Sequence, residues 1–300
     1  MISPGHAASA RAIKTMLSIG LCGQIACIWE ATAWKPGNVH RFCDFDDSNY
    51  LDYLLSAAAI ASVLESAGRQ PVGKTILEGV RATRRVARTN TNLGILLLLA
   101  PLAAVPRDQE LRAGLTAILE GLTVEDSRDA YQAIRLAVPG GLGKVPDQDV
   151  SEIPTLPLRQ VMSLAAERDL VALQYVNGFR EVFDEGLPAL LGALQNSPDM
   201  ERAIISCYLH LLADHPDSLI ARKRGKPEAD EASRRAAEVL ARGWPNLEAG
   251  RQTLAALDDW LRDEGHARNP GTTADLVTAC LFVALREGLI QLPREFNAIC

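Results

Sequence analysis

Hydrophobic residues recur along this chain at the three- to four-residue spacing of helices. The stretch 8–34 contains no proline and is apolar over most of its surface, which predicts a long buried helix. Pro36 disfavours helical backbone at Lys35, so a loop should follow to about Phe45. The same spacing, punctuated by proline, glycine and asparagine, predicts further helices over residues 48–67, 74–88, from 91 or 92 onward, 108–121, 125–137, 158–185, 187–196, 198–214, 229–242, 247–264 and 272–288.

No stretch alternates between apolar and polar residues as a half-buried strand would, and no βαβ rhythm is present. We therefore expect an all-α fold. No internal repeat or shift in composition marks a boundary, so residues 1–300 are expected to form a single multi-helix globular domain. The one long predicted loop covers 139–157, and loops of this length in compact domains often carry function.

The composition excludes wholesale disorder, because 48% of the 300 residues are hydrophobic and 23% are charged. The formal net charge of -6 argues against a nucleic-acid binder, which would carry a basic excess. The six cysteines form no C-x-x-C pair and are expected to be reduced, mostly in the core. The longest apolar block, 95–105, is too short to span a bilayer and no signal-peptide pattern is present. We expect a cytoplasmic protein with no membrane partner, and leave a homodimer open.

The segment 68–75 matches the phosphate-binding P-loop pattern G-x-x-x-x-G-K-[ST] letter for letter. A P-loop needs a buried strand before the loop and a helix after it. The preceding residues, SAAAIASVLESA, are alanine-rich and helical in character. We therefore interpret the segment as a turn between two helices.

Four arginines, Arg81, Arg84, Arg85 and Arg88, are spaced to share one face of a helix, and the polar segment 90–94 follows at once. One interpretation is a solvated face whose cations suit a helix C-terminus. The other is a polyphosphate cradle, in which the guanidinium groups act with amides at the start of the next helix. The spacing alone does not decide between them.

Charged and polar side chains crowd the end of the first predicted helix and the loop after it, among them Glu30, Lys35, Asn38 and Asp44. Oxygen ligands beside a lysine suit a complex of magnesium with a polyphosphate. Asp46 and Asp47 are better explained as caps for the next helix.

The basic run at 222–226, RKRGK, is either an exposed loop or a second phosphate contact. His210 and His215 lie just before it, but they are five residues apart and do not share a helical face, so they give little support for a zinc site. The segment 269–275 is a turn into a helix, and its first turn suits either a capping box or a phosphate site.

Taken together, several of these segments resemble blocks of the triphosphoribosyl-dephospho-CoA synthase family. EATAWKPGNV at 30–39 is similar to the family's "E…KPG-V" block, NTNLG at 90–94 to its "NT-x-x-G" block, and NPGTTADL at 269–276 to its "PGG-ADL" block. Further blocks fit at 140–143, 168–169 and 217–222. Each block is weak alone, but together they are specific and follow in order over nearly the whole chain.

The resemblance implies an all-helical enzyme that transfers a triphosphoribosyl unit from ATP to the 2′-hydroxyl of 3′-dephospho-CoA and releases adenine. The product is the precursor of the prosthetic group of the citrate lyase and malonate decarboxylase carrier subunits, and magnesium accompanies the ATP. Asn92 and Leu93 stand where the citrate-lyase members carry a histidine and a lysine, and Thr272 replaces one glycine of the "PGG" block. The residues that follow Lys35-Pro36-Gly37 also differ from those of the citrate-lyase members, so the chain resembles a divergent branch of the family.

This activity would need carboxylates near the anomeric carbon, a base for the acceptor hydroxyl, and cations and a metal for the triphosphate. We assign catalysis to Glu30 and Asp275, and magnesium binding to Glu30, Asp44, Asp214 and Asp217. The expected nucleotide and phosphate ligands are Lys35, Asn38, Arg84, Arg88, Asn90, Asn92, Arg222, Lys226 and Asn269. Two alternatives stay open: a ribosyl transferase with another acceptor, for example in a one-carbon cofactor pathway, and a non-catalytic helical protein that binds a nucleotide.

Overall fold

The computed structural model describes residues 17–140, 143, 145 and 147–297, and the regular structure within these ranges is helical apart from two isolated backbone bridges. The predicted all-α fold is confirmed. In chain order, with η1 a 3₁₀-helix and η2 a π-helix, the elements are α1 (Ile19–Thr32), α2 (Tyr50–Glu65), η1 (Ala67–Arg69), α3 (Val72–Thr83), α4 (Leu93–Ala104), α5 (Leu111–Glu120), α6 (Val124–Ala137), α7 (Leu158–Ser163), α8 (Leu170–Asn177), η2 (Glu181–Gly186), α9 (Leu187–Asn196), α10 (Met200–Asp214), α11 (Ser218–Arg224), α12 (Lys226–Ala241), α13 (Glu248–Arg262) and α14 (Gly271–Arg286).

Capping side chains set the starts of the first two helices. The Ser18 hydroxyl accepts a hydrogen bond from the backbone three residues on and begins α1, while residues 8–16 of the predicted helix lie outside the described residues. Asn49 caps α2 in a reciprocal capping box with Asp52. The prediction that Asp46 or Asp47 caps this helix is therefore wrong.

The helix α3 ends earlier than predicted, at Thr83, so Arg85 and Arg88 lie beyond it and the four arginines do not form one stripe. The chain turns back here because the Asn92 amide bonds to the Thr83 hydroxyl, with atom separations of 2.9 and 3.0 Å. The Arg84 guanidinium closes the turn by donating to the backbone carbonyl of Arg88.

The predicted helix at 158–185 is wrong, because the chain there forms three shorter elements, α7, α8 and η2. Asp169 starts α8 by accepting the amides of Val171 and Ala172, and Gly178 ends it with a left-handed backbone (φ 73°). The basic run at 222–226 is helical except at Gly225, since residues 222–224 end α11, which Asp217 caps, and Lys226 begins α12.

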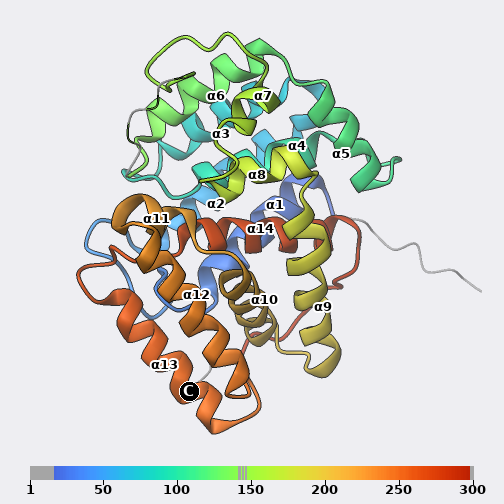
Figure 1. Ribbon diagram of the computed structural model, residues 1–300. Helices are drawn as coiled ribbons and strands as arrows, with labels where there is room; N and C mark the ends of the chain where they lie inside the picture. The colour runs from blue at the N-terminus through green and yellow to red at the C-terminus, as the bar shows by residue number, and fades with distance from the viewer. Residues whose placement is uncertain (1–16, 141–142, 144, 146, 298–300) are drawn as a thin grey trace, which may run out of the picture.

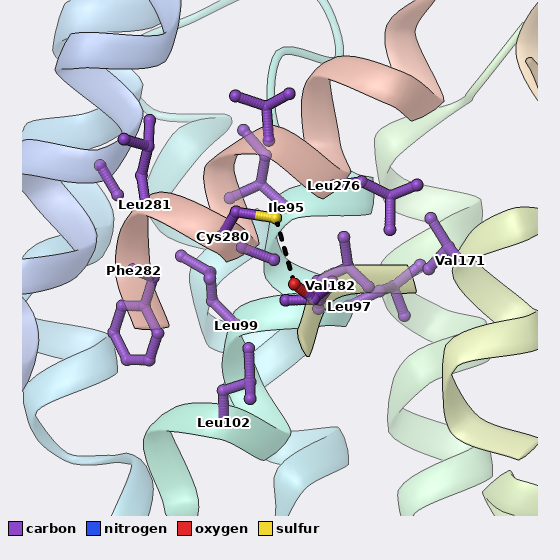
Figure 2. Close-up of a cluster of buried hydrophobic side chains, with 14 of the residues drawn as sticks. Ile95, Leu97, Leu99, Leu102, Val171, Val182, Leu276, Cys280, Leu281 and Phe282 are labelled. Atoms are coloured by element: carbon purple, nitrogen blue, oxygen red, sulfur yellow. Dashed lines mark hydrogen bonds between the residues drawn. The ribbon is translucent and has the colours of Figure 1, made fainter. Parts of the chain in front are cut away.

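The buried apolar side chains form one continuous core that extends from Cys22 to Ile290. Its centre is α14, which crosses the middle of the molecule, with α3 to α8 on one side and α9, α10, α12 and α13 on the other (Figure 1). Figure 2 shows Leu276, Cys280, Leu281 and Phe282 of this helix among side chains of α4, α8 and η2. Because α14 is buried along most of its length, its N-terminal end also lies inside the molecule.

The segment at 68–75 follows α2, begins within η1 and ends in the first turn of α3, which starts at Val72. Gly73 serves close packing, because a Cβ atom there would lie 2.4 Å from the Asp126 carbonyl oxygen of α6. The Gly73 amide also donates to the Asp126 carboxylate at 2.8 Å. The interpretation as a turn between helices is confirmed.

Four of the six cysteines, Cys22, Cys27, Cys207 and Cys280, are buried and unpaired, as expected. The apolar block at 95–105 forms the buried helix α4. One longer described stretch, Tyr50–Arg69, has the length and composition of a membrane-crossing helix. A single such helix is weak support for a membrane span, since helices of soluble proteins pass the same test.

Candidate active site

Lys35 follows the end of α1 and is completely buried. Its ammonium group pairs with Glu30 Oε1 at 2.9 Å and also donates to the backbone carbonyls of Glu30 and Ala33. A lysine has three N–H donors, and here all three are used inside the protein. Lys35 therefore holds the Glu30 carboxylate in place, and it has no proton left for the phosphate contact predicted from the sequence.

The loop that buries Lys35 depends on Gly37, whose backbone is left-handed (φ 73°) and whose Cβ, if present, would lie 2.7 Å from the Leu261 Cβ. The Gly37 amide donates to Asp258 of α13 at 2.7 Å. Asn38 is buried in the same loop, where its side-chain amide contacts the Tyr208 hydroxyl of α10 at 3.3 Å. The KPGN segment is thus fixed by two distant helices, and Asn38 belongs to this support.

Asp217 joins the starts of two helices. One carboxylate oxygen accepts the amides of Leu219 and Ile220 in α11, at 2.8 and 3.1 Å. The other accepts both the amide and the hydroxyl of Thr273 in α14, at 2.7 and 2.8 Å. These four bonds occupy the lone-pair sites of a carboxylate, so Asp217 acts as a double cap and offers no free oxygen to a metal.

Asp275 is the fifth residue of α14, surrounded by protein on all sides yet still partly accessible to solvent. Burial raises the pKa of its carboxyl well above the ordinary value, and the negative charges of Glu30, Asp217 and Asp169 raise it further. A Cβ atom on Gly94 would lie 2.0 Å from Asp275 Oδ2, so only glycine lets α4 start against this carboxylate.

Helix N-termini gather around Asp275. In addition to α14 and α4, the starts of α8 and α11 are joined by a 2.8 Å bond from the Leu170 amide to the Ser218 hydroxyl. Arg222 of α11 pairs with Asp169 at 2.5 Å and partly offsets the rise in the pKa of Asp275. The partial positive charge of these helix N-termini partly offsets the carboxylates gathered here, whose side chains already bond several of the N-terminal amides.

A narrow cavity, with room for about one water molecule, opens between α1, α2 and α4. Tyr53 of α2 is part of its wall, and burial raises the pKa of this phenol, with smaller contributions from the charges of Glu30 and Asp275. Of the two predicted catalytic carboxylates, Glu30 lines the cavity. Its lining consists of Cys27, Glu30, Tyr53, Ser56, Ala57, Thr91, Asn92 and Ile95.

Apart from Asn38, the three predicted asparagine ligands have different surroundings. Asn90 is exposed and its carbonyl accepts the Leu93 amide at 3.0 Å, which starts α4. Asn92 lines the cavity, but its amide is engaged by Thr83. The Asn269 side-chain oxygen is enclosed with no hydrogen-bond partner among the described residues, so it can accept a donor from a ligand.

The predicted cationic ligands are also divided by the structure. Arg222 reaches the surroundings of Asp275, as described above. Lys226 points to solvent and pairs with Asp230 at 2.7 Å, one turn along α12. Arg84 and Arg88 are exposed in the turn before α4. Of these four, Arg222 is the one whose charge acts on the Asp275 carboxyl.

The four carboxylates predicted to bind magnesium do not form one cluster. Glu30 is paired with Lys35, and Asp217 is saturated by helix amides and the Thr273 hydroxyl. Asp44 is exposed and accepts the Tyr50 amide at 2.7 Å, and Asp214 is exposed at the end of α10. The sequence-based prediction of a shared metal site is corrected accordingly, because Asp44 and Asp217 act as caps.

Some residues of the site were not predicted from the sequence. Asp169 caps α8 and faces Asp275, and Tyr53 lines the cavity. Lys223 packs near Gly140 of the long loop, at 3.3 Å from an added Cβ, and burial lowers the pKa of its ammonium. The "RD" block at 168–169 was a usable signal for Asp169, whereas nothing in the local sequence singles out Tyr53.

Comparison with known proteins adds to this geometry. The sequence pattern of the ATP:dephospho-CoA triphosphoribosyl transferase family matches residues 16–293. A probable 2-(5''-triphosphoribosyl)-3'-dephosphocoenzyme-A synthase of Pseudomonas syringae is 31% identical over 134 residues, which cover 42% of this chain and 45% of that protein. One of Salmonella gallinarum is 29% identical over 110 residues, covering 36% of this chain and 35% of the relative. The chain thus spans less than half the length of these curated relatives.

A crystal structure from Archaeoglobus fulgidus that carries the name triphosphoribosyl-dephospho-CoA synthase is similar to this fold. The TM-score is 0.62 at 28% sequence identity, and the match covers 78% of this chain and 99% of the other. The family pattern covers nearly the whole chain, and the fold agrees with that of a similarly named protein. The protein belongs to the ATP:dephospho-CoA triphosphoribosyl transferase family.

Proposed function

We propose that the protein transfers the triphosphoribosyl unit of ATP to the 2′-hydroxyl of 3′-dephospho-CoA and releases adenine. Family membership supports the reaction class. The observation that carries the proposal to particular residues is Asp275, a deeply set but accessible carboxylate where several helix N-termini gather. A site of this kind combines a base with a region that attracts phosphate.

In the proposed reaction, the bond between the ribose C1′ of ATP and adenine N9 breaks, and its electron pair leaves with adenine. The acceptor 2′-oxygen forms the new bond to C1′ and gives up its proton. A carboxylate with a raised pKa is a better proton acceptor near neutral pH, so Asp275 takes this proton. Adenine gains a proton as it leaves, which balances the reaction.

The triphosphate is assigned to the starts of α4 and α14, with Arg222 as the charged contact. Amides at helix N-termini bind phosphate oxygens without carrying a full charge, which suits a group that must later leave with the product. Glu30 faces the cavity wall, and its carboxylate is held there by Lys35. The negative charge of Glu30 is therefore fixed in place and can stabilise the positive charge that develops at C1′.

Magnesium is proposed to enter with ATP. This ion commonly keeps several waters and uses one or two carboxylates together with phosphate oxygens. The ion is assigned to phosphate oxygens and water, because Glu30 is paired with Lys35 and Asp275 is assigned as the base. The ion would neutralise charge on the triphosphate.

The test is incubation of the purified protein with ATP, magnesium and 3′-dephospho-CoA, followed by mass spectrometry of the products. We expect free adenine and an adduct that contains both the triphosphoribosyl unit and dephospho-CoA, in equal amounts. Omission of dephospho-CoA should abolish the adduct. Formation of ADP or AMP without adenine would contradict the proposed reaction.

A further inference from the structure

A second polar cluster is formed by η2 and the end of α10. Glu181, Glu185 and His215 each offer one ligand atom, and these atoms all lie within 4.8 Å of one another. Within the described part of the chain, no other group of three or more histidine, cysteine or acidic side chains brings its ligand atoms this close together. His215 Nε2 is 2.5 Å from Glu185 Oε2, and Glu181 is almost completely buried.

The fold fixes the backbone on both sides of this cluster. Glu181 and Glu185 are four residues apart in η2 and therefore share one side of it. Figure 2 shows that Val182, the residue after Glu181, lies among the buried side chains, where its carbonyl accepts a bond from the Cys280 thiol at 3.6 Å. His215 forms the C-terminal boundary of α10, which packs against η2. The three ligand groups are thus carried by ordered, packed elements.

A buried amide beside the cluster points to a missing ligand. Gln174 has no exposed surface, and its side-chain nitrogen donates to Glu181 Oε2 at 2.7 Å and to the Leu170 carbonyl at 3.1 Å. Both neighbours of this nitrogen are acceptors, so the amide cannot be turned around. Its oxygen therefore stays next to Glu181, buried and with no partner among the described residues. An unsatisfied buried oxygen is costly unless something binds it.

A cationic side chain, that of Arg180, lies near the cluster but makes no short ion pair with its carboxylates. Arg180 is largely exposed, and its guanidinium nitrogens lie 3.7 Å from Glu181 and 3.5 Å from Glu185. Asn177 donates to both oxygens of Glu181 and orients that carboxylate without adding charge. Two carboxylates and one imidazole therefore converge beside the buried Gln174 amide, and Arg180 pairs with both carboxylates only at longer distances.

We propose that Glu181, Glu185 and His215 bind a divalent transition-metal ion, with the Gln174 oxygen as a further ligand or as the acceptor of a metal-bound water. One imidazole nitrogen with carboxylate oxygens suits ions such as Mn²⁺ or Zn²⁺. Two ligands of one ion at about 2.1 Å lie about 3 Å apart, so His215 and Glu185 need to separate only slightly. The ion would take the place of the direct contact between His215 and Glu185.

This site goes beyond the proposed transferase reaction and does not depend on it. It is carried by η2 and α10, whereas the magnesium proposed above enters with ATP beside Asp275. Measurements without nucleotide therefore report on this site alone.

The experiment titrates the metal-free full-length protein with Mn²⁺ and counts bound ions by electron paramagnetic resonance, in the absence of nucleotide. We expect one bound Mn²⁺ per chain, retained in excess Mg²⁺ because imidazole favours the transition metal. His215→Gln and Glu185→Gln should each weaken binding by at least about tenfold, since even the supporting partners of metal ligands are worth roughly 10- to 100-fold. The matched control is His210→Gln, an exposed histidine on the same helix, which should bind as the wild type does.

Arg180→Gln gives a second test with the opposite sign. Removal of the nearby positive charge should tighten Mn²⁺ binding. If the cluster is only a structural ion-pair network, this substitution should not tighten Mn²⁺ binding. Circular dichroism checks that each variant is folded. Wild-type protein that binds no more Mn²⁺ than His215→Gln and Glu185→Gln would overturn the proposal and leave the cluster as an ion-pair network.

Discussion

Replacement of Lys35 by methionine separates a supporting role from a phosphate-binding role. In the wild type, the buried ammonium pairs with Glu30 at 2.9 Å and satisfies two backbone carbonyls. Methionine fills a similar volume but leaves the buried Glu30 carboxylate without its partner. Breaking a buried ion pair in this way costs about 3–5 kcal/mol. At roughly 2–4 °C per kcal/mol for a domain somewhat smaller than this one, the melting temperature should fall by roughly 6–20 °C.

Thermal unfolding followed by circular dichroism measures this change, and two variants serve as controls. Lys74→Met removes an exposed pair with Glu78 at 3.9 Å and should cost at most about 1 kcal/mol. Glu30→Gln combined with Lys35→Met removes both charges and should recover a large part of the lost stability. If Lys35→Met were as mild as Lys74→Met while ATP binding disappeared, Lys35 would be a phosphate ligand and the burial argument would be refuted.

Three further predictions concern the surroundings of Asp275. Because the pKa of Asp275 is raised in the folded protein, its charged form opposes folding, and Asp275→Asn should unfold at a higher temperature than the wild type at neutral pH. This gain in melting temperature should shrink as the pH falls and should vanish below the ordinary pKa of 3.8. A series of melting curves at different pH values measures it. Gly94→Ala would place a Cβ atom 2.0 Å from Asp275 Oδ2, and adenine release should fall about 100-fold because displacement of a catalytic group by about 1 Å costs this much. Arg222→Gln should weaken ATP binding roughly ten- to a hundred-fold in calorimetry, while Lys226→Gln, at a solvent-facing lysine, should not; equal affinities for both variants would remove Arg222 from the phosphate site.

The sequence was sufficient where local signals determine the structure. Helical spacing identified most of the helices, and a turn between helices was correctly preferred to a P-loop at 68–75. Helix boundaries were less predictable where several polar residues compete to cap. Asn49 caps α2 in place of Asp46 or Asp47 because Asp52 stands three residues later to complete the box, and Asp169 and Gly178 divide a stretch whose apolar spacing reads as one helix.

The site depends on contacts that no local pattern contains. Lys35 is buried because its loop is held by Tyr208 and Asp258, which lie far along the chain. In the sequence these distant contacts cannot be seen, so Lys35 in its polar loop was interpreted as a phosphate ligand. The histidine pair at 210 and 215 was judged on its own spacing, while the partner of His215 is Glu185, thirty residues earlier. Sequence spacing cannot reveal such pairs.

Adenine release from ATP in the presence of 3′-dephospho-CoA most directly tests the proposed role of Asp275. The comparison uses the wild type, Asp275→Asn, and the matched control Asp230→Asn, which changes an exposed aspartate paired with Lys226. Adenine should appear with the wild type and with Asp230→Asn, and should be lost or fall by at least about 100-fold with Asp275→Asn, since general-base catalysis contributes roughly 10²–10⁴-fold. Equal rates of adenine release from Asp275→Asn and the wild type would contradict the assignment of this carboxylate as the base.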